Sequence, residues 1–233
     1  MTTIEGSVAL VTGGQRGLGR AFVHGLLSRG AAKVYATARR TVESNDPRIV
    51  PLTLDITDPD AVEAVAAQAG DVGIVVNNAG ALFPGSLLKA DMADVVATFE
   101  TNVFGALRVA RAFAPILAAN GGGALVDIHS ALSWGAGAAA YGASKAALWS
   151  LTNSLRIELS GQHTQVVGVH LGFADTDMVK AMKVDKLSPE QVADAVLHGV
   201  EKGESEVLVD EVSRRMKAAL AGPVEGLTVT IGR

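Results

Sequence analysis

The sequence predicts a doubly wound α/β fold, in which about seven parallel strands are flanked by helices. Short runs of apolar and β-branched residues alternate along the whole chain with longer segments of helical spacing. Runs that are apolar throughout, such as residues 73–76, are typical of strands buried on both faces. Their alternation with helices implies parallel strands joined by right-handed crossovers. With 48% hydrophobic but only 4% aromatic residues, the core must be built mainly from small and branched aliphatic side chains.

Seven short segments are the expected strands. They cover residues 7–11, 33–37, 49–54, 72–77, 124–128, 165–170 and 206–209. The expected helices cover residues 17–28, 59–68, 92–119, 141–159, 189–202 and 211–221. Two helix starts are marked by local chemistry, because Asp58 and Ser188 stand at N-cap positions and each precedes a proline that suits the first helical turn. One domain over residues 1–233 is expected, since no linker or repeat divides the chain.

Composition and charge argue against several classes of protein. The 20 basic and 24 acidic residues give a net charge of −4 without any block of like charge, so no binding to nucleic acid is expected. The chain has no cysteine, and its five histidines show no ligand spacing, so no metal site is expected. Because no run of about 18 apolar residues and no signal peptide is found, we expect a soluble, cytoplasmic protein without a membrane span.

The first expected strand leads through a glycine-rich turn into an apolar helix. The turn reads Thr12-Gly13-Gly14-Gln15-Arg16-Gly17-Leu18-Gly19. Glycines in such a turn let the main chain approach a pyrophosphate closely, and the helix N-terminus adds N–H donors and the positive end of a dipole. The order of strand, glycine turn and helix therefore predicts a Rossmann-type dinucleotide site.

The end of the second expected strand bears on the choice of dinucleotide. An NAD-selective site places a carboxylate there, about 20 residues past the glycine turn, to hold the ribose 2′-hydroxyl. This chain has Arg39 and Arg40 instead, with no carboxylate before Glu43. Their guanidinium groups, together with Arg16 in the turn, are suited to a 2′-phosphate. The sequence thus predicts NADP(H), with NAD as the disfavoured alternative.

Tyr141 and Lys145 form a possible acid/base pair. They are four residues apart in a segment of helical character, so both side chains project from one face. A free phenol has a pKa of about 10, and a neighbouring ammonium lowers that pKa by stabilising the phenolate.

Motifs in this order resemble those of the short-chain dehydrogenase/reductase family. The family pattern T-G-x-x-x-G-x-G matches residues 12–19. Further matches are Asn-Asn-Ala-Gly at 77–80, Asn102, a serine ahead of the Tyr-Gly-Ala-Ser-Lys of 141–145, and residues 172–176. The resemblance spans most of the chain and implies hydride transfer between a nicotinamide and a carbonyl carbon.

The resemblance also assigns catalytic roles. Tyr141 would donate a proton to the developing alkoxide, and Lys145 would lower the pKa of the phenol and hold the nicotinamide ribose. Ser130 would orient the substrate carbonyl. Ser133 is its competitor, because the loop before Tyr141 looks short for the family, although the strand register favours Ser130. The main chain of Asn102 would fix a water that relays protons to the lysine.

Cofactor contacts follow from the same resemblance. Asp55 resembles the acid that contacts adenine, residues 78–80 the segment along the adenine ribose, and Thr176 the hydroxyl that meets the nicotinamide carboxamide. The family's usual proline is Leu171 here, which loosens the expected turn ahead of Thr176. The expected cofactor residues are Gly13, Gln15, Arg16, Gly17, Leu18, Arg39, Asp55, Asn78, Ala79, Gly80, Tyr141, Lys145 and Thr176.

The substrate is expected against a segment at about residues 172–190. Residues expected beside the catalytic group are nearly all apolar, which favours a hydrophobic ketone or aldehyde over a phosphorylated or acyl-carrier substrate. They are Phe83, Ala131, Leu132, Trp134, Phe173, Met178 and Met182. In the family, the helices holding Asn102 and Tyr141 commonly pair across subunits, so a homo-oligomer is expected, with dimer or tetramer left open.

Two other functions compete with this prediction. A catalytically silent, nucleotide-sensing regulator would keep the glycine turn but has no need for Ser130, Tyr141 and Lys145 together. A sugar-nucleotide epimerase would keep the tyrosine and lysine, but it normally needs a longer C-terminal substrate domain than the segment that follows Lys145 here.

Overall fold

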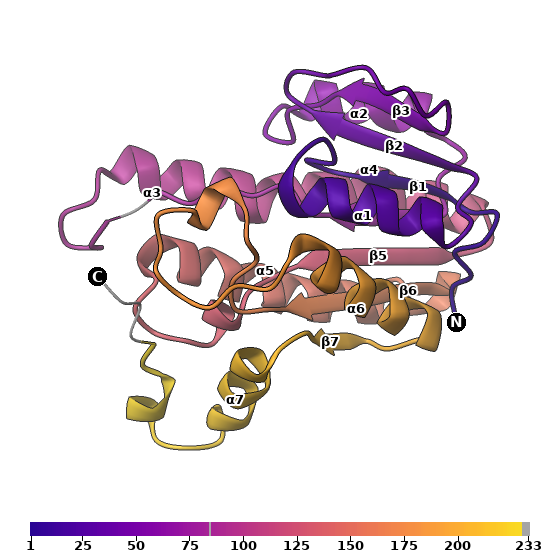
Figure 1. Cartoon of the computed structure of the whole chain (residues 1–233). Coiled ribbons are helices and arrows are strands. Elements are labelled where there is room, and N and C mark those ends of the chain that lie inside the picture. Colours follow the sequence, from indigo (N-terminus) through magenta and orange to yellow (C-terminus); the bar gives the residue numbers. More distant parts are fainter. Residues whose placement is uncertain (84, 230–233) are drawn as a thin grey trace.

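The computed structural model describes residues 1–83 and 85–229. It confirms the predicted α/β fold, with one sheet of seven parallel strands covered by helices on both faces (Figure 1). In the order β3-β2-β1-β4-β5-β6-β7, the strands are β1 (Val8–Val11), β2 (Lys33–Ala38), β3 (Ile49–Thr53), β4 (Ile74–Asn77), β5 (Gly123–Ile128), β6 (Thr164–His170) and β7 (Glu206–Leu208).

Seven α-helices accompany the sheet in the described part of the chain. They are α1 (Gly17–Ser28), α2 (Pro59–Gln68), α3 (Met92–Phe99), α4 (Ala106–Ala119), α5 (Ala139–Glu158), α6 (Pro189–Lys202) and α7 (Glu211–Ala219). Helices α1 and α6 pack together over one face of the sheet, where Ala9 and Val11 of β1 join their core. Leu10 points to the other face, which α2 and α4 cover. Successive residues of a strand alternate between faces, so β1 is buried on both sides.

The strand order changes direction at β1, which lies between β2 and β4. The chain runs outward from β1 to β3 and then returns to β4 on the other side of β1. In open α/β sheets, ligands bind in the crevice beyond the carboxyl ends of the strands at such a point. The glycine turn after β1 and the segment 77–80 at the end of β4 both lie there.

The predicted caps are also present. Asp58 accepts hydrogen bonds from the N–H groups of Asp60 and Ala61 at the start of α2. Ser188 and Gln191 form a reciprocal capping box at the start of α6. Such bonds satisfy N–H groups that have no partner within the helix.

The predicted helix over residues 92–119 is confirmed in its bounds, but it is not α-helical throughout. A π-helical segment, Glu100–Gly105, separates α3 from α4. It contains Asn102, whose side chain bonds the main chain of Ala81 and the hydroxyl of Ser144. A wider turn of this kind is often found at functional sites. Because these contacts are tertiary, periodicity along the helix could not reveal them.

By length and composition alone, residues 92–119 could cross a membrane, and 44% of the most apolar window in this stretch is buried within the fold. Its second half, α4, packs on α2, β4 and β5. This is the environment of a core helix in an α/β domain.

Several boundaries differ from the predicted ones. Strand β4 begins at Ile74 rather than at residue 72, α5 begins already at Ala139, and α7 ends at Ala219 rather than at residue 221. The sequence after α7 ends in a short run rich in valine and threonine, which lies only in part within the described residues, since these end at 229. What is described of it pairs with the loop before α5, since Ala136 and Thr228 form a parallel bridge.

Candidate active site

Ser130 lies just beyond the carboxyl end of β5. Its backbone is extended, with φ −159° and ψ 157°, and it caps a 3-10 turn in which its hydroxyl accepts the N–H of Leu132 at 3.1 Å. Its side chain is also close enough to Tyr141 to lower the pKa of that phenol. Ser133, the alternative considered from the sequence, accepts the N–H of Ser130 at 3.4 Å. The register of β5 therefore brings Ser130 to Tyr141 and leaves Ser133 to support the turn.

Tyr141 and Lys145 lie one turn apart on α5, and the Lys145 Nζ is 5.9 Å from the centre of the Tyr141 ring. Lys145 is only 4% exposed. Its ammonium donates a 2.6 Å hydrogen bond to the carbonyl oxygen of Ile128, the last residue of β5. This bond ties the lysine to the end of the strand that leads to Ser130.

Burial shifts the pKa of both groups. It raises the pKa of Tyr141 to about 12, although the Ser130 side chain acts in the opposite direction. The predicted lowering of the phenol pKa by Lys145 is not found, and the phenol is protonated at neutral pH. Burial also lowers the pKa of Lys145 to about 8, against the attraction of Asp127. The site combines a proton donor with an ammonium that is costly to bury.

Asn102 is fully buried, and its side chain is saturated with hydrogen bonds. Its Oδ1 accepts the N–H of Ala81 at 2.8 Å, while its Nδ2 donates to the Ala81 carbonyl and the Ser144 hydroxyl, each at 2.9 Å. The amide therefore joins the π-helical segment to the loop after β4 and to α5. A Cβ at Gly80 would lie 3.3 Å from Asn102 Oδ1 and 3.8 Å from Lys145 Nζ, so Gly80 is close to both.

The glycine turn is fastened to the end of β4. The Thr12 hydroxyl accepts the N–H groups of Asn78 and Ala79, each at 3.0 Å, and Asn78 Nδ2 donates to the Thr12 carbonyl at 2.9 Å. A Cβ at Gly19 would overlap the carbonyl oxygen of Gly13. Only glycine fits at position 19 without a shift of the main chain, as expected where helix and strand must pack closely.

The N-terminus of α1 is suited to an anion. No side chain caps it at Arg16, so its first N–H groups remain available for a ligand. Thr176 lies beside this turn, because a Cβ at Gly17 would be 3.2 Å from Thr176 Cγ2. Leu18 packs its side chain against the core, so a cofactor contact there would come from its main chain.

The segment ahead of Thr176 is held by hydrogen bonds although the family's proline is missing. The carbonyl of Leu171 accepts the N–H of Ala131 at 2.8 Å, and the N–H of Gly172 donates to Asp210 Oδ2 at 2.7 Å. These bonds fix a turn that the sequence alone led us to expect to be loose.

Gln15 links the glycine turn to the loop after β2. Its Oε1 accepts the N–H of Val42 at 2.7 Å, and its Nε2 donates to the carbonyl of Ala36 at 3.3 Å. Arg39 and Arg40 lie in the sequence between Ala36 and Val42, and both arginines are exposed. Gln15 therefore closes the loop that carries both arginines.

Asp55 lies close enough to Arg39 for the guanidinium charge to lower the pKa of the carboxyl group. Burial alone would raise the pKa of Asp55, but hydrogen bonds from the N–H and hydroxyl of Thr57, together with Arg39, bring that pKa below its ordinary value. Asp55 is thus ionised at neutral pH, beside the loop where an adenine ribose is expected.

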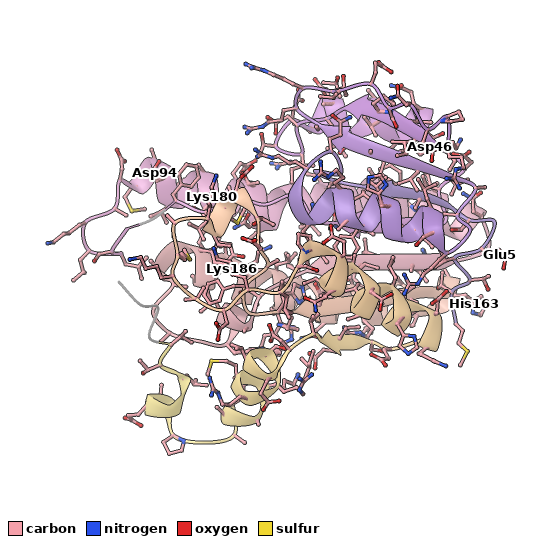
Figure 2. The ribbon with its side chains drawn as sticks, viewed as in Figure 1. Glu5, Asp46, Asp94, His163, Lys180 and Lys186 are labelled. Carbon is pink, nitrogen blue, oxygen red and sulfur yellow. The ribbon has the colours of Figure 1, made fainter. Side chains whose placement is uncertain are left out.

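A loop over residues 173–187 forms the expected substrate segment. Two hydrogen bonds of 2.9 Å close its base, from Asp175 N–H to the Leu187 carbonyl and from Leu187 N–H to the Phe173 carbonyl. Figure 2 shows Lys180 and Lys186 on this loop, at the same end of the molecule as Asp94 of α3.

The residues expected to line the substrate site differ in burial, and Phe173 and Met182 are half-buried. Phe83 and Met178 are 40% and 44% exposed, whereas Ala131, Leu132 and Trp134 are buried. The placement of Trp134 against the substrate is therefore not supported. Its ring stacks on His170 with centroids 3.8 Å apart, because it belongs to the hydrophobic cluster under α7.

Sequence reasoning also missed a buried pair of histidines behind Ser130. His129 and His170 have ring centroids 4.7 Å apart, although 41 positions separate them in the chain. His129 follows β5, and His170 ends β6. Because β5 and β6 are neighbours, the strand register was the signal in the sequence that could have predicted the pair. Within the described ranges, no three His, Cys, Asp or Glu side chains gather as a metal site would require.

Comparison with known proteins identifies the family. Residues 7–187 match the family model for short chain dehydrogenases. The chain therefore belongs to the short-chain dehydrogenase/reductase family of oxidoreductases, as its motifs predicted.

Individual relatives agree with this assignment. A 3-oxoacyl-[acyl-carrier-protein] reductase FabG of Salmonella typhimurium is 34% identical over 198 residues, covering 79% of this chain and 80% of that protein. An NADP-dependent 3-hydroxy acid dehydrogenase of Schizosaccharomyces pombe is 27% identical over 90% of this chain and 93% of that protein. A crystal structure of a short chain dehydrogenase from Burkholderia cenocepacia in complex with NADP has a TM-score of 0.92 and 37% identity, with 97% of each chain covered.

Proposed function

We propose that this protein is an NADP(H)-dependent oxidoreductase that interconverts a hydrophobic ketone or aldehyde and its alcohol. One observation carries the proposal: Tyr141 and Lys145 lie one helical turn apart with Lys145 Nζ 5.9 Å from the centre of the phenol ring, and the Ser130 side chain is close enough to lower the pKa of Tyr141. All three lie at the edge of the sheet that also holds the glycine turn. A binding protein without chemistry would not need this group.

The residues of the crevice fit the cofactor. The uncapped start of α1 and the close packing at Gly19 suit a pyrophosphate, and the loop with Arg39 and Arg40 suits a 2′-phosphate. Gln15 holds the loop that carries both arginines, and Asp55 lies near Arg39, which supports the same choice. When bound, the nicotinamide supplies or accepts the hydride. The relatives named for NADP, and the relative solved with NADP, support the same choice.

The chain's own residues move and hold the proton. Tyr141 is protonated at neutral pH and donates its hydroxyl proton to the carbonyl oxygen during reduction. Ser130 holds that oxygen in place and stabilises its growing charge. After the transfer, the ammonium of Lys145 stabilises the negative charge of the Tyr141 phenolate. Burial of the site strengthens the attraction between the two charges. In the oxidation direction the same groups act in reverse.

The loop over residues 173–187 supports an apolar substrate. It carries Phe173, Met178 and Met182, and its Thr176 lies beside the glycine turn. Its three lysines are matched by three aspartates, one of which pairs with Lys186 at 3.7 Å, so it presents no net positive charge to an acidic carrier. The FabG relatives nevertheless make a 3-oxoacyl thioester a second candidate.

The test is NADPH oxidation over a panel of hydrophobic ketones, aldehydes, quinones, 3-oxoacyl thioesters and charged sugars. We expect turnover of hydrophobic carbonyls, and Tyr141→Phe should lower kcat by about 1,000-fold while NADPH still binds. A preference for charged sugars would contradict the substrate class. Binding of NADPH without turnover of any carbonyl would favour the silent regulator instead. A cytoplasmic location, a single domain and a homo-oligomer remain predictions from the sequence.

A further inference from the structure

The buried pair His129 and His170 has no role in the proposed chemistry. Both rings are sealed from solvent, with 1% and 0% exposed. The Nδ1 of His129 lies 3.1 Å from the Nε2 of His170, so the rings share a hydrogen bond. Buried polar groups that are fully paired often fix a unique arrangement of the elements around them.

The other nitrogen of His170 faces the catalytic loop. Its Nδ1 lies 3.1 Å from the carbonyl oxygen of Ser130. A carbonyl oxygen can only accept, so the hydrogen of this bond must belong to Nδ1. The same carbonyl also accepts the N–H of Ser133 at 3.0 Å, so both of its lone pairs are used.

The direction of this bond sets the directions of its neighbours. Burial lowers the pKa of His170 to about 4, so the ring is neutral at pH 7 and its Nε2 accepts from His129. The Nε2 of His129 is then free to accept from the Thr152 hydroxyl, 2.9 Å away. Thr152 in turn lies 2.7 Å from a carboxyl oxygen of Asp127, and burial raises the pKa of Asp127. With the Thr152 proton directed to His129, the proposed arrangement requires the proton of this 2.7 Å contact to lie on Asp127.

Two charged side chains, those of Glu206 and Lys217, lie near His170. Glu206 Oε1 lies 3.7 Å from its Nε2, and Lys217 of α7 lies 2.8 Å from the other carboxylate oxygen of Glu206. Lys217 also lies 5.0 Å from the ring centre of Trp134, which stacks on His170. The ion pair and the stacked ring hold the imidazole in one orientation.

We propose that His170 is a positioning residue for catalysis, whose Nδ1–H holds the Ser130 carbonyl and so keeps the extended backbone that directs the Ser130 hydroxyl to Tyr141. This inference rests on the proposed function. It does not place His170 in contact with substrate. Its effect passes through the main chain of one residue.

Two variants separate the hydrogen bond from the packing. The amide nitrogen of asparagine occupies the position of Nδ1 along the side chain, and that of glutamine the position of Nε2. We expect His170→Asn to keep kcat within about threefold, and His170→Gln to lower it by about 10- to 100-fold with the KM for NADPH unchanged. Both variants should lose similar thermal stability. Equal kcat in the two variants would overturn the proposal, since packing loss alone would then explain both.

A second measurement is independent of activity. In the wild-type chain labelled with ¹⁵N-histidine, NMR at pH 7 should show Nδ1 of His170 protonated and its Nε2 unprotonated, with assignment from the two variants. An unprotonated Nδ1 would overturn the proposal whatever the kinetics. If the wild-type chain reduces no carbonyl, the proposed function fails, and the NMR result still decides whether His170 donates to Ser130.

Discussion

The Nζ of Lys145 donates to the carbonyl oxygen of Ile128 at 2.6 Å, which places a buried ammonium against the last residue of β5. This contact satisfies one of the three donors of the ammonium. Burial still dominates and lowers the pKa of Lys145 from 10.5 to about 8. The lysine therefore has a cost for folding that its role in the site would explain.

Replacing this lysine should stabilise the fold and abolish turnover. The unfolded chain keeps the Lys145 proton up to about pH 10.5, whereas the folded chain releases it near pH 8. The cost is thus full below pH 8 and declines as the pH rises towards 10.5. We expect Lys145→Met to raise the free energy of unfolding at pH 7 by about 2 kcal/mol.

Urea denaturation at pH 7 and pH 9.5 measures this effect, and the gain should be smaller at the higher pH. A methionine variant that is less stable than the wild type at pH 7 would contradict the prediction. The loss of the bond to Ile128 would then outweigh the relief of the buried charge.

Ser130 and Ser133 give a matched test of the catalytic serine. Each takes part in the same capping box, so either alanine variant removes one bond of that turn. Of the two serines, Ser130 is the one whose side chain affects the pKa of Tyr141. We expect Ser130→Ala to lower kcat by about 100-fold, as for loss of one donor to a developing oxyanion, and Ser133→Ala to leave kcat near the wild-type value. Steady-state kinetics with NADPH and one carbonyl decides it, and the reverse ranking would assign the role to Ser133.

The packing at the glycine turn makes another prediction. A Cβ at Gly19 would overlap the Gly13 carbonyl and approach Asn78 Nδ2 to 2.7 Å. We expect Gly19→Ala to lower the free energy of unfolding by about 3 kcal/mol and to weaken NADPH binding, because the turn must shift. Gly70 is exposed with nothing within 4 Å of its would-be Cβ, so Gly70→Ala should change neither. Chemical denaturation and fluorescence titration with NADPH measure both properties.

The sequence predicted the sheet because its signals are local. The strand at residues 73–76 and the glycine turn after β1 are each determined by a few residues that are adjacent in the sequence. Asp58 and Ser188 marked helix starts for the same reason. Tyr141 and Lys145 could also be paired in advance, since the spacing within one helix determines which side chains share a face.

Features that depend on contacts between distant segments could not be predicted. The π-helical segment around Asn102 depends on Ala81 and Ser144, which the helical period does not encode. Trp134 looked like a substrate contact because it is apolar and close to Ser130 in sequence. Its stacking on His170 depends on the register of β5 against β6, and the pKa of Tyr141 depends on how deeply α5 is buried.

The loop after β2 should determine the choice between NADPH and NADH. Arg39 is exposed and close enough to Asp55 to lower its pKa, and Gln15 holds the same loop through the N–H of Val42 at 2.7 Å. A guanidinium that pairs with a 2′-phosphate contributes a charge-assisted bond that NADH cannot form. We expect Arg39→Ala to lower the ratio of kcat/KM for NADPH over NADH by about tenfold.

Gln15→Ala should lower this ratio less, by about threefold, because it frees the loop but keeps both arginines. Arg48 provides the control, since it belongs to the same connection but is paired with Asp46 at 2.7 Å. Arg48→Ala should therefore leave the ratio unchanged. The measurement is initial rates with each nucleotide at a fixed carbonyl concentration. A wild-type chain that prefers NADH, or an Arg48 variant that loses selectivity as strongly as the Arg39 variant, would show that this loop does not recognise the phosphate through Arg39.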